Sequence, residues 1–338
     1  MKKQKFTLFV GIDISKKTFD VAIINGTTLS HDSFVFENTT KGTKAMINLL
    51  KNRKINIHET FFCMEHTGVY GKLIIARLLE IQAFFCVEMA LKIMRATVVS
   101  RGKNDKLDAI RIAKYALKNH RELDLYKPSS LIVKKVRALL SLRNQLLRFS
   151  IEIQRQPNEL KHFDPELLKT TLKPVNKILK FINSQIEETE QQIIELVAGD
   201  EKLNQHIQLA TSVPGIGKFT ALYIACFTDL FSKYNTPKQL ACYCGVVPFE
   251  YSSGTSVRKR PRVHHMANKI LKTHLHMGAL SAVRFDPELK MYYLRKIEEG
   301  KNPMLVLNNV RNKMIHRLCA VLKRGKPFIK KKIEINLV

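Results

Sequence analysis

Hydrophobic and polar positions alternate differently in three parts of the chain, and each pattern predicts its own kind of structure. Residues 1–125 contain short apolar runs rich in β-branched and aromatic side chains, separated by polar turns. The runs in FTLFVGIDISKKTFDVAIING predict a hairpin of two strands, and HDSFVFENT, ETFFCMEHTG and AFFCVE predict three more. Helical spacing in TKGTKAMINLLKNRKI, in residues 72–81 and from Lys103 onward predicts helices. Strands followed by alternating strands and helices indicate an α/β domain with a mixed sheet.

The middle of the chain, residues 126–205, has apolar residues three and four positions apart, as a coiled coil requires. A first series runs through Leu139, Leu142, Leu146, Phe149 and Ile153. We expect a break at Pro157 and Pro165. A second series follows: Leu168, Leu172, Val175, Leu179, Ile182, Ile186, Thr189, Ile193 and Leu196.

Two arrangements account for these series. A helical hairpin packed on its own domain explains the first one. The second series has Glu187, Glu188 and Glu190 on its polar face, and it favours pairing with a helix of another chain. Residues 126–205 are therefore predicted to form a helical linker that takes part in oligomerisation.

Residues 206–338 begin with short helices that glycine and proline interrupt, in SVPGIGKFTALYIACFTDLFSKYNTPKQLACYCGVVP. The stretch FEYSSGTSVRKRPR predicts a polar, basic loop, and the rest predicts mainly helix, ending in the basic tail KRGKPFIKKKIEINLV.

Charge narrows the class of partner. The chain has 338 residues, 45% of them hydrophobic, and a formal charge of +28. Residues 250–338 alone hold 20 Lys+Arg and 6 Asp+Glu, which is 20 − 6 = +14. So basic a protein favours a polyanion, and nucleic acid above acidic lipid.

Other features of the composition favour a cytoplasmic location. The apolar run Phe6 to Val10 is too short for the core of a signal peptide, and no segment approaches the roughly 20 apolar residues of a membrane span. The six cysteines are scattered, as expected for reduced, mostly buried thiols.

Four acidic residues stand out against this basic background. Asp13 in VGIDIS and Glu65 in FFCMEHTG lie in apolar strands, where an acid is costly to bury unless a cation compensates it. Asp105 and Asp108, in KNDKLDAIRIAKYAL, share one helical turn and have few lysines nearby. Singly, such acids can be turn residues or helix N-terminal acids. Together they are the oxygen ligands that a hard divalent cation prefers, and we interpret metal ions as the missing partners of the two aspartates.

The order strand-Asp, strand-Glu, then KNDKLDA resembles the DEDD transposases of the Piv-invertase-related insertion-sequence family. SVPGIGKFTALYIACFTDL, LACYCGVVPFEYSSGTS and the basic run after them resemble the C-terminal transposase domain of that family, so the resemblance spans residues 8–285. It implies a RuvC-like catalytic domain of RNase H-like fold in residues 1–125 and a mainly helical transposase domain in 206–338. It also implies that Asp13, Glu65, Asp105 and Asp108 bind Mg²⁺, as one or two ions, with Mn²⁺ as a substitute.

The resemblance further implies a serine that attacks DNA and becomes covalently linked to it. Ser253, directly before Gly254, matches that position best and Ser252 second, although a serine in such a loop is ordinarily a turn residue. The residues expected to hold a phosphate beside it are Arg258, Lys259, Arg260 and Arg262. In VPGIGKFTA, Gly215, Gly217 and Lys218 could approach a phosphate in the manner of a helix-hairpin-helix, or could form a tight turn between packed helices.

The function implied by the resemblance is a recombinase that excises and inserts a mobile element. Its partners would be DNA (element ends or a circular junction, and a target), a structured bridge RNA that guides it, and further copies in a dimer or tetramer. Two alternatives are a junction-resolving nuclease that uses water and a non-catalytic DNA-binding scaffold, although four acids in the α/β domain argue against the scaffold. GIDIS also resembles an actin-like phosphate-binding turn, but the second glycine-rich Asp loop of that fold is not found in the sequence.

Overall fold

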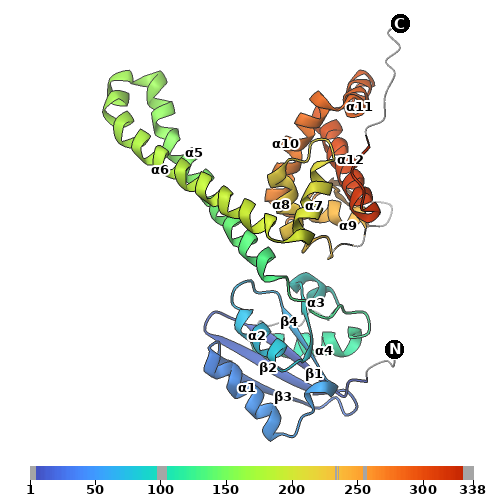
Figure 1. Ribbon diagram of the computed structural model, residues 1–338. Coiled ribbons are helices and arrows are strands. Elements are labelled where there is room, and N and C mark those ends of the chain that lie inside the picture. Colours follow the sequence, from blue (N-terminus) through green and yellow to red (C-terminus); the bar gives the residue numbers. More distant parts are fainter. Residues whose placement is uncertain (1–4, 97–104, 233, 235, 254–256, 330–338) are drawn as a thin grey trace. The chain divides into compact units, whose positions relative to one another are not determined.

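The computed structural model describes residues 5–96, 105–232, 234, 236–253 and 257–329, with backbone alone for 105, 106, 250–253 and 257–260. The chain divides into two compact units, residues 1–128 and 129–338 (Figure 1). The predicted regions 126–205 and 206–338 both lie almost wholly in the second unit.

The first unit is built on a five-stranded sheet. Its elements are β1 (Leu8–Ile14), β2 (Thr18–Asn25), β3 (His31–Glu37), α1 (Thr40–Asn52), a short 3₁₀ helix η1 (Ile57–Glu59), β4 (Thr60–Glu65), α2 (Lys72–Glu80), β5 (Phe84–Glu88), α3 (Ala90–Ala96) and α4 (Asp105–Asn119). The strand order is β3-β2-β1-β4-β5; β1, β2 and β3 are antiparallel, whereas β4 runs parallel to β1 and to β5. This confirms the predicted mixed sheet and is compatible with an RNase H-like domain.

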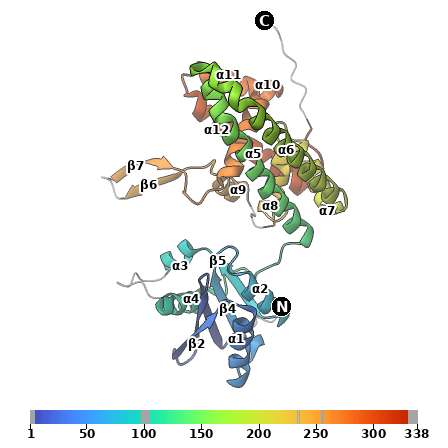
Figure 2. The same ribbon diagram turned by 90° about the vertical axis from the view of Figure 1, so that its left-hand side faces the viewer.

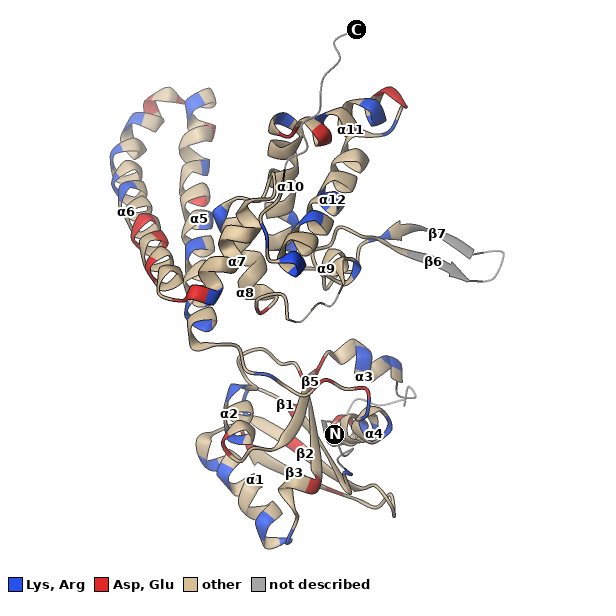
Figure 3. Ribbon diagram, turned by 45° about the vertical axis from the view of Figure 1, so that its right-hand side comes forward, with Lys and Arg blue, Asp and Glu red and all other residues tan. Residues whose placement is uncertain are grey.

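Alternating residues of the four strands β1, β2, β4 and β5 contribute to two separate buried faces. Val10 and Ile12 pack with Met46 of α1 and Ile74 of α2, whereas Phe9 and its neighbours in β4 and β5 pack with α4. Helices α1 and α2 therefore cover one face and α4 the other (Figure 3). The strict alternation fixes which face each polar residue of a strand joins.

The second unit begins with a long helical hairpin, α5 (Leu131–Phe163) and α6 (Pro165–Ala198), whose helices lie side by side (Figure 1). Asp164 makes the turn: its side chain accepts a hydrogen bond from the backbone N–H of Leu167, and Pro165 follows at the first helical position. The expected break at Pro157 is wrong, because α5 continues through this buried proline. An interior proline costs the helix one backbone hydrogen bond. The packing of α5 against α6 offsets that cost.

The second apolar series packs against α5 of the same chain. Ile182, Ile186 and Ile193 are buried, and the polar Thr189 is buried with its hydroxyl donating to the carbonyl oxygen of Gln185 at 2.7 Å. Of the two arrangements that the sequence allowed, the structure supports a hairpin within the chain for both series.

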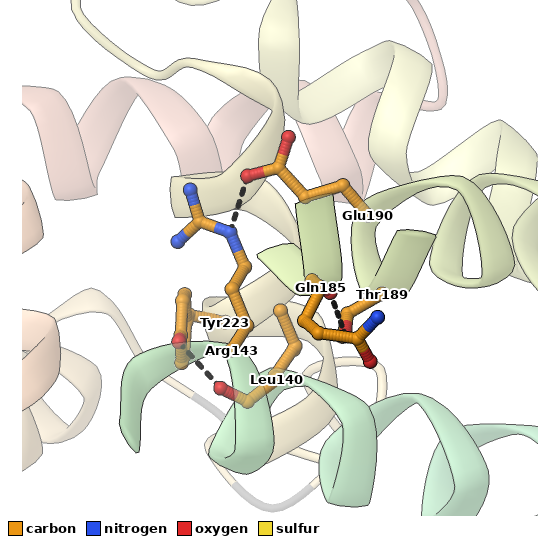
Figure 4. Close-up of polar contacts among 6 residues, drawn as sticks. All are labelled: Leu140, Arg143, Gln185, Thr189, Glu190 and Tyr223. Carbon is orange, nitrogen blue, oxygen red and sulfur yellow. Dashed lines mark hydrogen bonds and ion pairs between the residues drawn. The ribbon is translucent and has the colours of Figure 1, made fainter. Parts of the chain in front are cut away.

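The base of the hairpin is fixed to the helices that follow (Figure 4). Arg143 of α5 pairs with Glu190 of α6 (Nε–Oε1 2.6 Å), and its guanidinium lies 3.8 Å from the ring centre of Phe219. The hydroxyl of buried Tyr223 donates to the carbonyl oxygen of Leu140 at 2.9 Å. Hairpin and core thus form one continuous packed structure.

The remaining elements are α7 (Glu201–Thr211), α8 (Lys218–Phe227), α9 (Pro237–Tyr243), β6 (Phe249–Ser253), β7 (Val257–Arg262), α10 (Lys269–Phe285), α11 (Pro287–Glu298) and α12 (Pro303–Arg324). Strands β6 and β7 pair as an antiparallel hairpin that projects from the helices (Figure 2). The prediction of a polar, basic loop here is wrong, because Phe249, Tyr251 and Val257 supply the β-branched and aromatic residues that strands favour.

Candidate functional site

A row of four carboxylates crosses the sheet of the first unit. Asp13 of β1 lies directly opposite Asp20 of β2, and Glu65 of β4 lies directly beside Glu88 of β5. Ile12 pairs with Met64, so Asp13 and Glu65 are the next residues along two neighbouring parallel strands. Paired residues of adjacent strands point to the same face of a sheet. All four acids therefore belong to the face that α4 covers.

Gly11 allows α4 to approach that row. A Cβ atom on Gly11 would lie 2.2 Å from the carbonyl oxygen of Ala109 and 2.3 Å from the backbone nitrogen of Ala113. Further along α4, Leu117 lies near Gly26, at the other end of the strands. Helix α4 thus runs antiparallel to β1, and its N-terminal turn, which carries Asp105 and Asp108, lies at the Asp13 end of the sheet.

The interpretation that both helical aspartates lack a basic partner is wrong for Asp108. Its Oδ1 atom lies 2.7 Å from Nη1 of Arg111, three residues later on α4, and both side chains are about a quarter exposed, at 24% each. Helical spacing brings Arg111, three residues after Asp108, onto the same side of α4. The side chain of Asp105 lies outside the described residues.

The donor chemistry of this row fits a divalent cation, since carboxylate oxygens are the ligands that Mg²⁺ and Mn²⁺ prefer. Among the side chains that the structure describes, no three His, Cys, Asp or Glu residues gather closely enough to hold an ion. Asp13, Glu65 and Asp108 are half-buried. These three residues supply carboxylate oxygens from β1, β4 and α4. In the described structure they are not close enough together to coordinate one ion.

Several groups around the row are buried. Glu88 is 9% exposed and pairs with Lys92 of α3 (Nζ–Oε2 3.1 Å). Burial, and secondarily the Glu88 carboxylate, raises the pKa of Tyr115 on α4 to about 12. A side-chain hydrogen bond with Cys86, and secondarily burial, also raises the pKa of Cys63, two residues before Glu65. The Tyr115 hydroxyl and the Cys63 thiol therefore stay protonated at neutral pH.

Asp20 and Glu88 were missed by the sequence analysis. Asp20 is only 8% exposed and stands in TFDVAII, an apolar strand interrupted by one acid, which is the signal that singled out Asp13. Asp20 lies opposite Asp13 because of the register of the β1–β2 hairpin. That register depends on the geometry of the turn between the two strands.

The predicted serine lies on the β6–β7 hairpin. In the backbone register Ser252 is opposite Arg258 and Ser253 is opposite Val257. The side chains of Ser252, Ser253, Arg258, Lys259 and Arg260, and all of Gly254, lie outside the described residues. Arg262, at the end of β7, is exposed.

The two glycines of VPGIGKFTA differ in their surroundings. Gly215 has φ +84°, and a Cβ there would lie 2.5 Å from the carbonyl oxygen of Gly278 on α10, so close packing requires this glycine. Gly217 is exposed, has no neighbour within 4 Å of a Cβ, and begins α8 without a side-chain cap. Contact with a phosphate stays a prediction for all three residues, and Gly217 with exposed Lys218 offers the open backbone for it.

The sequence matches known proteins over most of its length. Residues 10–163 match a family of DEDD proteins of IS110 elements described as Transposase, and residues 207–294 match the family described as Transposase IS116/IS110/IS902. The pilin gene-inverting proteins of Moraxella lacunata and Moraxella bovis are 25% identical over 327 residues, which is 96% of this chain and 98% of each relative. An uncharacterised protein of insertion element IS110 from Streptomyces coelicolor is 30% identical over 115 residues, 34% of this chain and 28% of the relative.

These matches, with the acidic row and the mixed sheet, define a DNA transposase or recombinase. The chain belongs to the IS110 family of DEDD transposases. Within the described residues, no helix combines the length and the apolar character that crossing a membrane requires.

Proposed function

We propose that this chain excises and inserts a mobile DNA element, with Asp13, Glu65, Asp105 and Asp108 as the metal-binding acids and Ser253 as the nucleophile. The observation that carries the proposal is the acidic row beneath the N-terminal turn of α4, in a chain of the IS110 family. The formal charge of the chain is +28, so the rest of the molecule attracts phosphates and can bring DNA to the acidic site.

Asp13 and Glu65 would hold divalent ions from the sheet, and Asp105 and Asp108 from the helix. Bound Mg²⁺ would neutralise charge on the reacting phosphate and favour ionisation of the attacking hydroxyl. Arg111 would hold the Asp108 carboxylate in place until a metal ion competes for it. The close contact at Gly11 would keep helix and sheet at a fixed separation.

Ser253 would attack a phosphodiester. A bond forms between its Oγ atom and phosphorus as the bond from phosphorus to the departing strand oxygen breaks; the serine proton leaves to a base and the departing oxygen gains a proton. Arg258, Lys259, Arg260 and Arg262 would bind the phosphate and offset its developing charge. Arg258 directly follows Val257, the residue that pairs with Ser253, which supports this assignment for the start of β7, whereas Arg262 pairs with Phe249 at the other end of the strand.

The proposed partners are element DNA, target DNA, a structured guide RNA and at least one more copy of the chain. If base pairing by RNA selects the site, few side chains need to contact base edges. Strand exchange should then depend on the RNA that co-purifies with the chain. Ribonuclease treatment should abolish strand exchange while leaving the protein folded.

Covalent trapping tests the chemistry. Labelled DNA with an element junction would be incubated with Mg²⁺, co-purifying RNA and the wild type, Asp13→Asn or Ser253→Ala, and separated on a denaturing gel. We expect a covalent protein–DNA band for the wild type alone. Asp124→Asn, an exposed acid elsewhere in the first unit, is the control and should behave as wild type.

A water-using nuclease is the second candidate, because it would use the same acids. Free cleaved ends that need Asp13 but not Ser253 would establish it and refute the serine assignment. Full activity in Asp13→Asn would refute the metal-binding assignment of the acidic row as well.

A further inference from the structure

The solvent-facing side of α6 carries separated charges. The exposed residues of this helix that lie opposite its contact with α5 recur every three or four positions, and we call them the α6 stripe: Lys173, Lys177, Lys180, Ser184, Glu187, Glu188, Gln191 and Glu195. Lysines occupy the half nearer the hairpin tip, and glutamates occupy the half nearer the base (Figure 3). Ser184 lies between the two halves.

This distribution is unfavourable within one helix. Like charges four residues apart repel each other, and lysines at 173 and 177 are in that relation. Glu195 lies in the last turn of α6, where the helix macrodipole favours a cation. Mixed charges would stabilise an exposed helix better, so the separation suggests a partner outside the chain.

The described contacts of the stripe provide no compensating charge. Glu188 accepts hydrogen bonds from Gln185 and Gln192, and Glu195 from Gln191, all of them neutral donors. Among the residues described, Lys173, Lys177 and Lys180 form no ion pair, whereas Lys169 pairs with Glu166 nearer the tip.

The stripe is complementary to itself when reversed. Lys180 stands four residues before Ser184 and Glu188 four after; Lys177 and Gln191 stand seven before and after; Lys173 and Glu195 stand eleven before and after. We propose that the α6 stripe binds the α6 stripe of a second copy, with the helices antiparallel and a two-fold axis at Ser184. Each lysine half then faces the partner's acidic half, as an isologous contact requires.

Apolar surface beside the stripe adds to this contact. Phe181 is 66% exposed and lies four residues after Lys177, so it flanks the stripe there. Exposed ion pairs are individually weak and are screened by salt, so the pairing must be salt-sensitive and must act alongside other contacts of the assembly. The inference rests on the proposed assembly of several copies and names the surface that one of their contacts uses.

Nucleic acid is the competing occupant of the lysine half. A phosphate backbone lying along the helix would meet the carboxylates of Glu187, Glu188 and Glu195 about 10 to 30 Å further along the helix, at 1.5 Å per residue. The full stripe therefore fits an antiparallel copy better than a polyanion.

Disulfide trapping tests the position of the axis. Ser184→Cys should form a reducible, crosslinked dimer under mild oxidation, because the two copies of this position face each other. Asn183→Cys, also exposed but about 100° around the helix, is the matched control, with wild type to measure crosslinking by the native cysteines. Equal crosslinking of the two variants would overturn the proposed register.

Charge reversal tests the partner. Lys173→Glu, Lys177→Glu and Lys180→Glu together make the stripe acidic, and Glu187→Lys, Glu188→Lys and Glu195→Lys together make it basic. In sedimentation at low salt, each triple variant should lose at least tenfold in self-association, a mixture of the two should recover it, and the chain with all six changes should again self-associate.

Other outcomes identify what is wrong. If wild type self-associates and both triple variants do so equally, another surface makes the contact, and the inference fails while the assembly stands. If wild type stays monomeric even on junction DNA, the proposed assembly fails with it. If the acidic variant loses affinity for DNA or RNA and the mixture does not recover self-association, the lysine half binds nucleic acid instead.

Discussion

At Gly11 the absence of a side chain determines how closely α4 approaches the sheet. Replacing Gly11 by Ala would place a methyl group 2.2 Å from a backbone oxygen and 2.3 Å from a backbone nitrogen of α4, neither of which can rotate away. We expect Gly11→Ala to lower the free energy of unfolding by about 2 kcal/mol or more, as overpacking does. Chemical denaturation of the full chain measures this.

Gly71 offers a matched control in the same unit. Its φ is −77° and a Cβ there would meet its nearest neighbour at 3.5 Å, which is ordinary contact. Gly71→Ala should be neutral or should raise the free energy of unfolding by a few tenths of a kcal/mol, up to about 1. If both variants are equally stable, α4 does not depend on close contact with β1.

Two cysteines at the end of α9 should differ in reactivity. Burial raises the pKa of Cys244 to about 12, whereas Cys242 is half-buried. The thiolate is the reactive form, and at pH 8 a thiol with a pKa of 12 is ionised to only about one part in ten thousand. In native protein at pH 8, alkylation followed by mass spectrometry should modify Cys242 and leave Cys244 unmodified until the chain unfolds.

The same shift has a consequence for stability. Because folding raises the pKa of the Cys244 thiol above its ordinary value near 9, its stabilising contribution is complete below that pH and is lost as pH rises toward 12. Equal alkylation of Cys242 and Cys244 at pH 8 would contradict the buried environment of Cys244.

At the scale of elements, the Arg143–Glu190 pair joins α5 to α6 within the hairpin, and the Tyr223 hydroxyl joins α8 of the core to α5. The side chains of Arg143 and Glu190 are 14% and 29% exposed, and the guanidinium also stacks on Phe219. We expect Arg143→Ala to cost about 2 to 3 kcal/mol of unfolding free energy, Glu190→Gln about 1 and Tyr223→Phe about 1. A double-mutant cycle should give a coupling between Arg143 and Glu190 of about 1 kcal/mol.

An exposed pair on α5 is the control for this cycle. Arg155 and Glu159 are 80% and 61% exposed, four residues apart. Removing either side chain should change the unfolding free energy by less than about 0.5 kcal/mol. A coupling at Arg143–Glu190 no larger than this would mean that apolar packing alone holds the hairpin.

The elements of the first unit were predictable because their patterns are local. Short apolar runs in β1, β2 and β4 and helical spacing in α1 and α2 identify each segment without knowledge of its neighbours. The β6–β7 hairpin was not predicted, since its strands FEYSS and VRKRPR are rich in polar and charged residues. The continuation of α5 through Pro157 depends on packing with α6, which no local pattern reports.

The candidate site was predictable only in part, for a related reason. Asp13, Glu65, Asp105 and Asp108 stand out as acids in apolar or basic surroundings. Asp20 and Glu88 join them through strand register, and Arg111 reaches Asp108 through helical geometry. Whether Ser253 belongs to the same chemistry depends on an arrangement of the whole assembly that the sequence of one chain does not specify.

At the scale of the whole molecule, the formal charge of +28 is unevenly distributed. A protein that neutralises phosphates releases counterions, so the logarithm of its affinity for duplex DNA falls with the logarithm of salt concentration by about 0.9 per phosphate contact. If Arg258, Lys259, Arg260 and Arg262 each bind a phosphate, replacing all four by Gln should reduce that slope by about 3 to 4. Fluorescence anisotropy at several salt concentrations measures it.

The control for this slope must change the net charge equally. Lys41, Lys44, Lys51 and Lys54 are exposed on or just after α1, away from the β6–β7 hairpin in sequence and in a different unit. Replacing these four by Gln should leave the slope within about 1 of wild type, although it lowers the net charge by the same amount. If the slope depends on total charge alone, both variants should show the same reduction in slope. In that case β7 is one part of a diffuse basic surface. A loss confined to the β7 variant would locate the phosphate contacts beside Ser253, where strand cleavage needs them.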